Sequence, residues 1–122
     1  MKTYKVNAFG RDWNLSLFVA HYQNNGRLAI LVRDADTEEP FGTLTVNIDA
    51  FVPDDSEDKV RYAFLKIYSE NEAWAPELIE AMRSDGVAEC IHGMEVSNGN
   101  VEFPLWGFDT AKLLEVVTGE IS

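Results

Sequence analysis

The residue types best suited to catalysis are few in this chain and lie apart. Its two histidines, His21 and His92, stand in unrelated parts of the sequence. A histidine that acts as a general base needs an oriented partner, and neither has a recognisable one, so we interpret both as incidental. The single cysteine, Cys90, follows Glu89 and has no adjacent cation to lower its thiol pKa. We expect it to be a small, half-buried apolar residue, and we assign no catalytic residue.

Two aspartates are spaced like the first ligands of a calcium-binding loop. Asp34 and Asp36 fit such a loop, but position six is Glu39 instead of glycine and position twelve is Thr45 instead of an acid. The chain also lacks a phosphate-binding loop, a dinucleotide fingerprint, a nucleophile elbow and zinc-ligand spacing. The sequence therefore predicts no metal site and no cofactor.

Acidic residues are concentrated in one stretch of the sequence that contains no basic residue. From Asp34 to Asp58 there are nine of them and neither Lys nor Arg. One interpretation is a surface that docks a basic protein partner or mimics nucleic-acid phosphates. The other is a pair of solvated loops that discourage edge aggregation. The candidate partner-binding residues are Asp34, Asp36, Glu38, Glu39, Asp54, Asp55, Glu57 and Asp58.

The overall charge narrows the classes of partner. Ten Lys and Arg stand against 21 Asp and Glu, a net charge of −11. Binding to nucleic acid or to an anionic membrane requires basic residues, so we expect neither. No segment is apolar enough for a signal peptide or a membrane span. These features predict a cytoplasmic protein.

Large aromatic residues in the second half suggest a second kind of site. Trp74 precedes a predicted helix, and Trp106 follows a predicted hairpin. With Tyr68 and His92 they could line a ligand pocket, but such rings also anchor helices to sheets. Both interpretations remain open.

Period-two alternation predicts five N-terminal strands that follow one another as an antiparallel meander. Turns are predicted at Gly10-Arg11 and at Asn25-Gly26. A two-residue loop at Asn25-Gly26 would pair Val19 with Val32 and His21 with Ile30. In the fourth strand, Leu44, Val46 and Ile48 would face inward, and Thr43, Thr45 and Asn47 outward. The five strands are expected at 4–8, about 13–19, about 27–34, about 41–48 and about 60–68.

The second half mixes helix and strand signals. Ser69 and Glu72 form a capping box before a main helix from Ala75 to Ser84, which ends at Gly86. An Asn-Gly turn predicts a hairpin over 95–103 that pairs Val96 with Val101 and Met94 with Phe103. Asp109 caps a short last helix. The chain is thus predicted to be one α+β domain, 1–122, with a mostly antiparallel sheet.

Several phrases resemble a known family in the same order along the chain. They are NAFGRDWNLSL at 7–17, NNGRLAI at 24–30, EPFGTLTVNI at 39–48, AWAPELIEAM at 73–82 and FPLWGFDTAKL at 103–113. The chain resembles the bacterial domain-of-unknown-function family numbered 4313, whose members occur on mobile elements. The resemblance implies no activity, cofactor or catalytic residue.

These observations favour a non-enzymatic accessory protein, of mobile-element or phage type, that binds a basic protein partner. One form of this hypothesis is an inhibitor that mimics nucleic acid and acts on a nucleic-acid enzyme. One alternative is a small-molecule-binding or weakly catalytic domain with a pocket near Trp74 and Trp106. Another is a structural subunit that forms homo-oligomers through an edge strand, since the sequence leaves the oligomeric state open.

Overall fold

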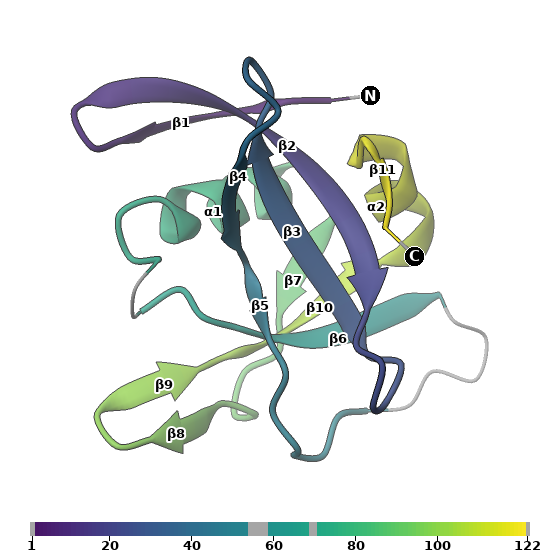
Figure 1. Ribbon diagram of the computed structural model, residues 1–122. Helices are drawn as coiled ribbons and strands as arrows, with labels where there is room; N and C mark the ends of the chain where they lie inside the picture. The colour runs from purple at the N-terminus through teal and green to yellow at the C-terminus, as the bar shows by residue number, and fades with distance from the viewer. Residues whose placement is uncertain (1, 54–58, 69–70, 122) are drawn as a thin grey trace.

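Two mostly antiparallel sheets, a hairpin and two helices make up the computed structural model, which describes residues 2–53, 59–68 and 71–121 (Figure 1). The first sheet has the order β1-β2-β3-β4, and β11 pairs with β2 in parallel. The second has the order β5-β6-β10-β7, and β8 pairs with β9. The strands of the first sheet are β1 (Tyr4–Ala8), β2 (Arg11–His21), β3 (Leu28–Asp34), β4 (Pro40–Thr43) and β11 (Gly119–Glu120). The other strands are β5 (Thr45–Val46), β6 (Val60–Leu65), β7 (Ala88–Cys90), β8 (Val96–Asn98), β9 (Val101–Phe103) and β10 (Leu105–Asp109).

The predicted α+β class is confirmed, but the meander is shorter than five strands. The fifth predicted strand, β6, belongs to the second sheet, and the predicted strand 41–48 is divided between β4 and β5. Leu44 lies at the transfer point, because its N–H donates to Ile30 in the first sheet while its carbonyl accepts from Lys66 beyond β6. Strands that pass between sheets build the corner of two crossed sheets, and Figure 1 shows β6 running across β2 and β3.

Thr45 corrects the predicted in–out pattern of that strand. It was expected to face outward, but only 1% of its surface is exposed. Its hydroxyl accepts from the Ile30 N–H at 3.1 Å and shares a hydrogen bond with the Tyr22 hydroxyl at 2.9 Å. At the corner both faces of the chain are covered, so the alternation of buried and exposed residues is lost.

The first predicted hairpin register is wrong by two residues. β2 pairs Val19 with Ile30, and Tyr22 donates to Arg27 to close a four-residue loop. A two-residue type I′ turn needs positive φ at both central residues. Within this described loop, Gly26 has positive φ (+69°) and Asn25 does not.

The other two turns each lie one position away from the predicted turn. In β8–β9, Val96 pairs with Phe103, so Gly99 and Asn100 are the turn residues. Gly99 has φ +66°, and glycine at the first central position is typical of a type II′ turn. In β1–β2 the turn is Phe9-Gly10, with φ of +52° and +78°, instead of Gly10-Arg11.

The helices form as predicted. Helix α1 spans Ala75–Ser84, and after it Gly86 has φ +76° while the Val87 N–H donates to the Met82 carbonyl. This is the hydrogen bond of a Schellman ending. At its start, the N-cap Trp74 makes no side-chain cap, and Ser69 of the predicted capping box lies outside the described residues. Helix α2 spans Thr110–Val116, and Asp109 accepts from the Lys112 N–H at 3.0 Å, as expected of its N-cap.

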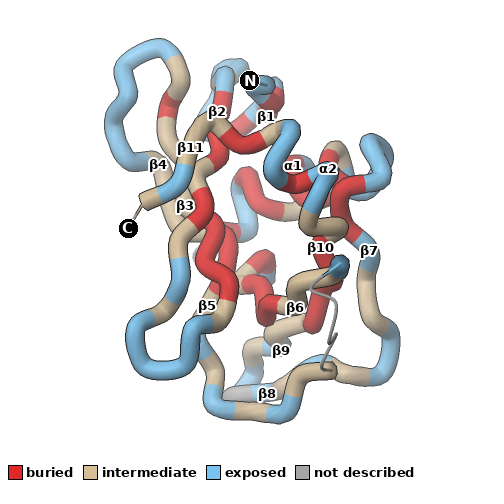
Figure 2. Tube along the Cα trace, turned by 90° about the vertical axis from the view of Figure 1, so that its right-hand side faces the viewer, coloured by how far each residue is buried: buried red, intermediate tan, exposed pale blue. Residues whose placement is uncertain are grey.

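The core lies between the two sheets and beneath both helices, and Figure 2 shows buried segments from all of these elements facing one another. The inner face of the first sheet contributes alternating residues such as Leu15, Leu17 and Ile30. The second sheet contributes Trp106 and Phe108. Among the described residues, no helix combines the length and apolar character needed to cross a membrane.

Candidate functional site

The residues suited to catalysis have different surroundings in the structure. His21, at the end of β2, lies 3.0 Å from the guanidinium of Arg61, whereas His92 is exposed in the loop after β7. Cys90 is half-buried, and burial, followed by the charge of Glu95, raises its thiol pKa. A raised pKa keeps the thiol protonated and poorly nucleophilic. Over the described residues, no three His, Cys, Asp or Glu side chains are grouped to hold a metal ion.

The four residues of the hypothetical aromatic pocket have different environments. Trp74 is 3% exposed and Trp106 is 7% exposed, and both belong to the core. Tyr68 is 55% exposed, and His92 is also exposed. The two tryptophan rings therefore anchor elements to the core, and they are not available to line a ligand groove.

The first acidic loop is well ordered by its own backbone. Asp34 is 7% exposed, and its carboxylate accepts from the Asp36 N–H at 3.0 Å. The Glu38 N–H donates to the Asp34 carbonyl at 2.7 Å. Asp36, Glu38 and Glu39 are exposed, so three of the four acids present their charge to solvent while Asp34 is structural. The second acidic group, Asp54, Asp55, Glu57 and Asp58, lies outside the described residues.

An aromatic cluster beside this loop was not expected from the sequence. The Phe41 ring lies 6.4 Å from Phe9, 5.1 Å from Trp13 and 5.3 Å from Trp74, measured between ring centroids. The Arg11 guanidinium covers Trp13 at 3.9 Å. Trp74 is the buried member of the cluster. We call Phe9, Trp13 and Phe41 the aromatic ridge.

Phe9 stands out on two counts. It has φ +52° at the tip of the β1–β2 hairpin, a conformation in which a bulky residue is an outlier. Its side chain is also 68% exposed. Backbone strain of about 1–3 kcal/mol at one residue is characteristic of functional sites. The sequence signal, visible only in retrospect, is Phe-Gly at the two positions where a type I′ turn prefers Asn-Gly.

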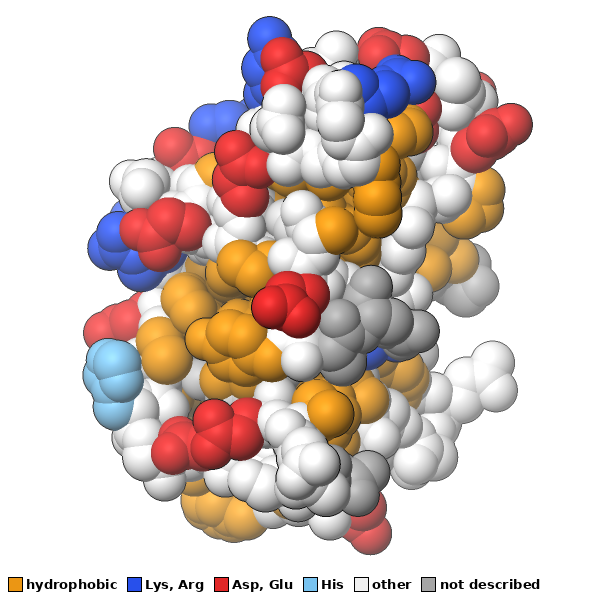
Figure 3. Space-filling model, turned by 90° about the vertical axis from the view of Figure 1, so that its left-hand side faces the viewer, with side chains coloured by type: hydrophobic (Ala, Val, Ile, Leu, Met, Phe, Trp, Pro, Cys, Tyr) orange, Lys and Arg blue, Asp and Glu red, His pale blue; other side chains and the backbone are white. Residues whose placement is uncertain are grey.

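The ridge and the acidic loop occupy the same end of the first sheet. Glu39 and Phe41 are separated by Pro40 alone, and β1–β2 and β3–β4 turn at this end. Figure 3 shows hydrophobic side chains near the top of the molecule with acidic side chains beside them. The arrangement joins an apolar surface suited to a protein anchor with a carboxylate rim suited to cations.

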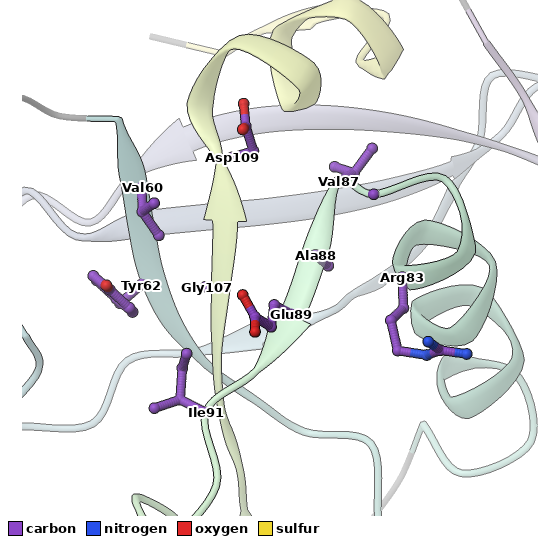
Figure 4. Close-up of a pocket in the computed structure, with 10 residues that line it drawn as sticks. Val60, Tyr62, Arg83, Val87, Ala88, Glu89, Ile91, Gly107 and Asp109 are labelled. Atoms are coloured by element: carbon purple, nitrogen blue, oxygen red, sulfur yellow. The ribbon is translucent and has the colours of Figure 1, made fainter.

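A separate hollow of about 410 Å³ lies on the outer face of the second sheet (Figure 4). Gly107 forms its floor, because a Cβ there would come within 3.1 Å of Val60 and 3.3 Å of Tyr62. Glu89 supplies a carboxylate at the rim, while Asp109 already caps α2. Arg83 lines the edge, but it binds Glu80 and extends away from the strands in Figure 4.

Comparison with protein-family models, with curated proteins and with solved structures finds no match for this chain. The resemblance to the family numbered 4313 stays a prediction.

Proposed function

We propose that this protein is a non-enzymatic binding domain that docks a basic protein partner through the aromatic ridge and the acidic loop 34–39. The observation that carries the proposal is Phe9, an exposed aromatic ring in a strained hairpin position. The strained backbone of Phe9 lowers the stability of the fold. A ring that is 68% exposed contributes little hydrophobic stabilisation to offset this loss. Such a cost is expected where the residue binds something outside its own chain.

The ridge has the composition of an interface centre. Aromatic residues and arginine are enriched in such centres and supply much of the binding energy. Trp13 is held by a hydrogen bond from its indole N–H to the Ala8 carbonyl at 2.9 Å, and Phe41 rests edge-on against buried Trp74. Because these rings are already positioned, little conformational entropy would be lost on binding.

The charge around the ridge supports a basic partner. Asp36, Glu38 and Glu39 are exposed on the adjoining loop, and the net charge of −11 would speed the encounter with a cation-rich surface. Nucleic-acid-binding proteins carry such surfaces. Within this proposal the domain is an accessory protein, of mobile-element or phage type, that occupies a phosphate-binding surface and inhibits its owner.

The test compares two single variants as bait for capture from a bacterial lysate. Phe9→Asn removes the ring of the ridge, and Phe51→Asn removes a ring that is 76% exposed elsewhere. We expect a basic protein to be retained by wild type and by Phe51→Asn, and released by Phe9→Asn. Affinity measured with that purified protein should fall at least about 30-fold, since an aromatic anchor contributes roughly 2 kcal/mol or more.

Thermal unfolding of the same variants distinguishes binding from a structural role. Asparagine adopts positive φ more readily than phenylalanine, so Phe9→Asn should be as stable as wild type or up to about 1 kcal/mol more stable. Equal capture by both variants, or lower stability of Phe9→Asn, would contradict the proposal.

A further inference from the structure

Strand β7 forms one edge of the second sheet. It is the last strand in the order β5-β6-β10-β7 and pairs with β10 on one side. The Val87 carbonyl and the Ile91 N–H both hydrogen-bond to the backbone of β10, at 2.9 and 3.0 Å. Backbone groups of successive residues in an antiparallel strand point to alternate sides. The N–H and C=O groups of Ala88 and Cys90 therefore face away from β10, toward the free edge.

These edge groups have no partner in the described part of the chain, where no hydrogen bond involves the backbone of Ala88 or Cys90. The edges of the first sheet are different. There, Glu77 accepts from an N–H of β1 at 2.8 Å, and Asn71 donates to a carbonyl of β4 at 2.8 Å. Proteins usually cover or block the edges of their sheets, and an edge with free donors and acceptors can pair with a strand from another protein.

Open space borders the free edge of β7. The hollow of about 410 Å³ is lined by Ala88 and Glu89 of β7, and also by Arg83 and Gly86 from the end of α1 and the turn after it. Because α1 lies beyond β7 as seen from β10, the hollow extends past the strand to its open side. Figure 4 shows Glu89 beside the strand and Arg83 extended away from it.

The side chains of β7 specify the sequence that an added strand needs. Glu89 is exposed on the outer face and forms no ion pair among the described residues, whereas Ala88 and Cys90 pack with the core on the opposite face. A residue opposite Glu89 would be in a non-hydrogen-bonded pair, with Cα atoms about 4.5 Å apart, where side chains are closest. Opposite charges are favourable in such a pair. We propose that β7 binds an extended segment of another protein, with Lys or Arg opposite Glu89 and an apolar residue on each side of it.

A second copy of this chain is disfavoured at this edge. Two β7 strands related by a twofold axis through Glu89 would place the two Glu89 carboxylates opposite each other, and like charges in that position are destabilising. Besides burial, the charge of Glu95 raises the pKa of the Cys90 thiol, so a second carboxylate lies near the edge. The net charge of −11 also opposes self-association. A basic segment is favoured by the same charges.

The test measures amide hydrogen exchange by NMR in the full chain, with a capped peptide that alternates valine and lysine as the probe. Near saturation, the peptide should slow exchange of the Ala88 and Cys90 amides at least about threefold. The Glu89 amide already faces β10 and should not change. In the proposed pairing the valine N–H groups point toward β7 and the lysine N–H groups point to solvent. N-methylation of the valines should therefore reduce affinity at least about tenfold, whereas N-methylation of the lysines should not.

Charge reversal tests the residue opposite Glu89. Glu89→Lys should bind the valine–lysine peptide at least about threefold more weakly, and it should prefer a valine–glutamate peptide. Glu120→Lys is the matched control, because it makes the same change at an exposed residue of β11 in the first sheet. It should keep the preference for the valine–lysine peptide. Both variants should unfold at the wild-type temperature, since both positions are exposed.

Three results would overturn the proposal: unchanged exchange at Ala88 and Cys90, equal binding of the two N-methylated peptides, or an unchanged peptide preference in Glu89→Lys. Slower exchange at these amides when the protein alone is concentrated would also overturn it, because a second copy would then occupy the edge. Phe9→Asn should bind the valine–lysine peptide as wild type does, so failure here is distinct from failure of the docking proposal.

Discussion

Gly42→Ala tests how the first turn of α1 is seated on the first sheet. A Cβ at Gly42 would lie 2.6 Å from Trp74 Cζ2 and 3.2 Å from Cη2. Both atoms belong to a rigid ring that is 3% exposed and lies edge-on against Phe41. The φ of Gly42 is not positive, so the effect of the added methyl group is steric. Relief would require Trp74, the N-cap residue of α1, to move.

The expected cost follows from the missing space. Ordinary contact needs about 3.4–4 Å, so the ring must yield by about 1 Å, and overpacking of this kind costs about 1–3 kcal/mol. Replacing glycine also restricts the unfolded chain, which returns roughly 0.4–1 kcal/mol. We expect a net loss of about 1–2 kcal/mol, or a fall in melting temperature of roughly 3–10 °C.

Urea unfolding of a double-mutant cycle identifies the cause. Trp74→Phe shortens the ring and should remove much of the cost of Gly42→Ala, giving a favourable coupling of about 1 kcal/mol. Gly107→Ala is the control, since its nearest neighbour is a Val60 methyl at 3.1 Å beside an open hollow. The steric explanation would be refuted if the effects of Gly42→Ala and Trp74→Phe were additive. It would also be refuted if Gly107→Ala lowered the stability more than Gly42→Ala does.

Two further predictions concern titrating groups. Hydrogen bonds from Lys2 and Tyr4 lower the pKa of the Asp85 carboxylate, so its contribution to stability is present above the unfolded pKa near 4 and is lost as pH falls through the lower folded pKa. Asp85→Asn should therefore be less stable than wild type in urea at pH 7, with the difference shrinking below about pH 3. For Cys90, burial raises the thiol pKa, so alkylation at pH 8 should be several-fold slower in the folded protein than in urea. Equal rates would contradict the buried position of the thiol.

Local signals in the sequence predicted the helices well. Pro76 near the start and Gly86 after the end locate α1, and Asp109 locates α2. These are short-range effects of proline geometry, positive φ and side-chain capping, so neighbouring residues suffice to predict them. The registers of the hairpins depend on which turn residues take positive φ. The Asn-Gly pairs in the sequence were not enough to predict this.

Long-range features were less accessible. The passage of the chain between sheets at Leu44 depends on hydrogen bonds to Ile30 and Lys66, which no local pattern encodes. The acidic loop was found because charge is visible in composition. The aromatic ridge was missed because the turn was predicted at Gly10-Arg11, and the place of Phe9 in the turn appears only with the register of β1–β2.

The parallel pairing of β11 with β2 also affects synthesis on the ribosome. Beyond Leu15, which pairs with Tyr4, the side of β2 next to β1 is completed by Thr118–Ile121, about one hundred residues later. At about 5–20 residues per second, the backbone of Leu17–Val19 waits roughly 5–20 s for its partner. During that interval an apolar strand edge is open to chaperones and to neighbouring nascent chains.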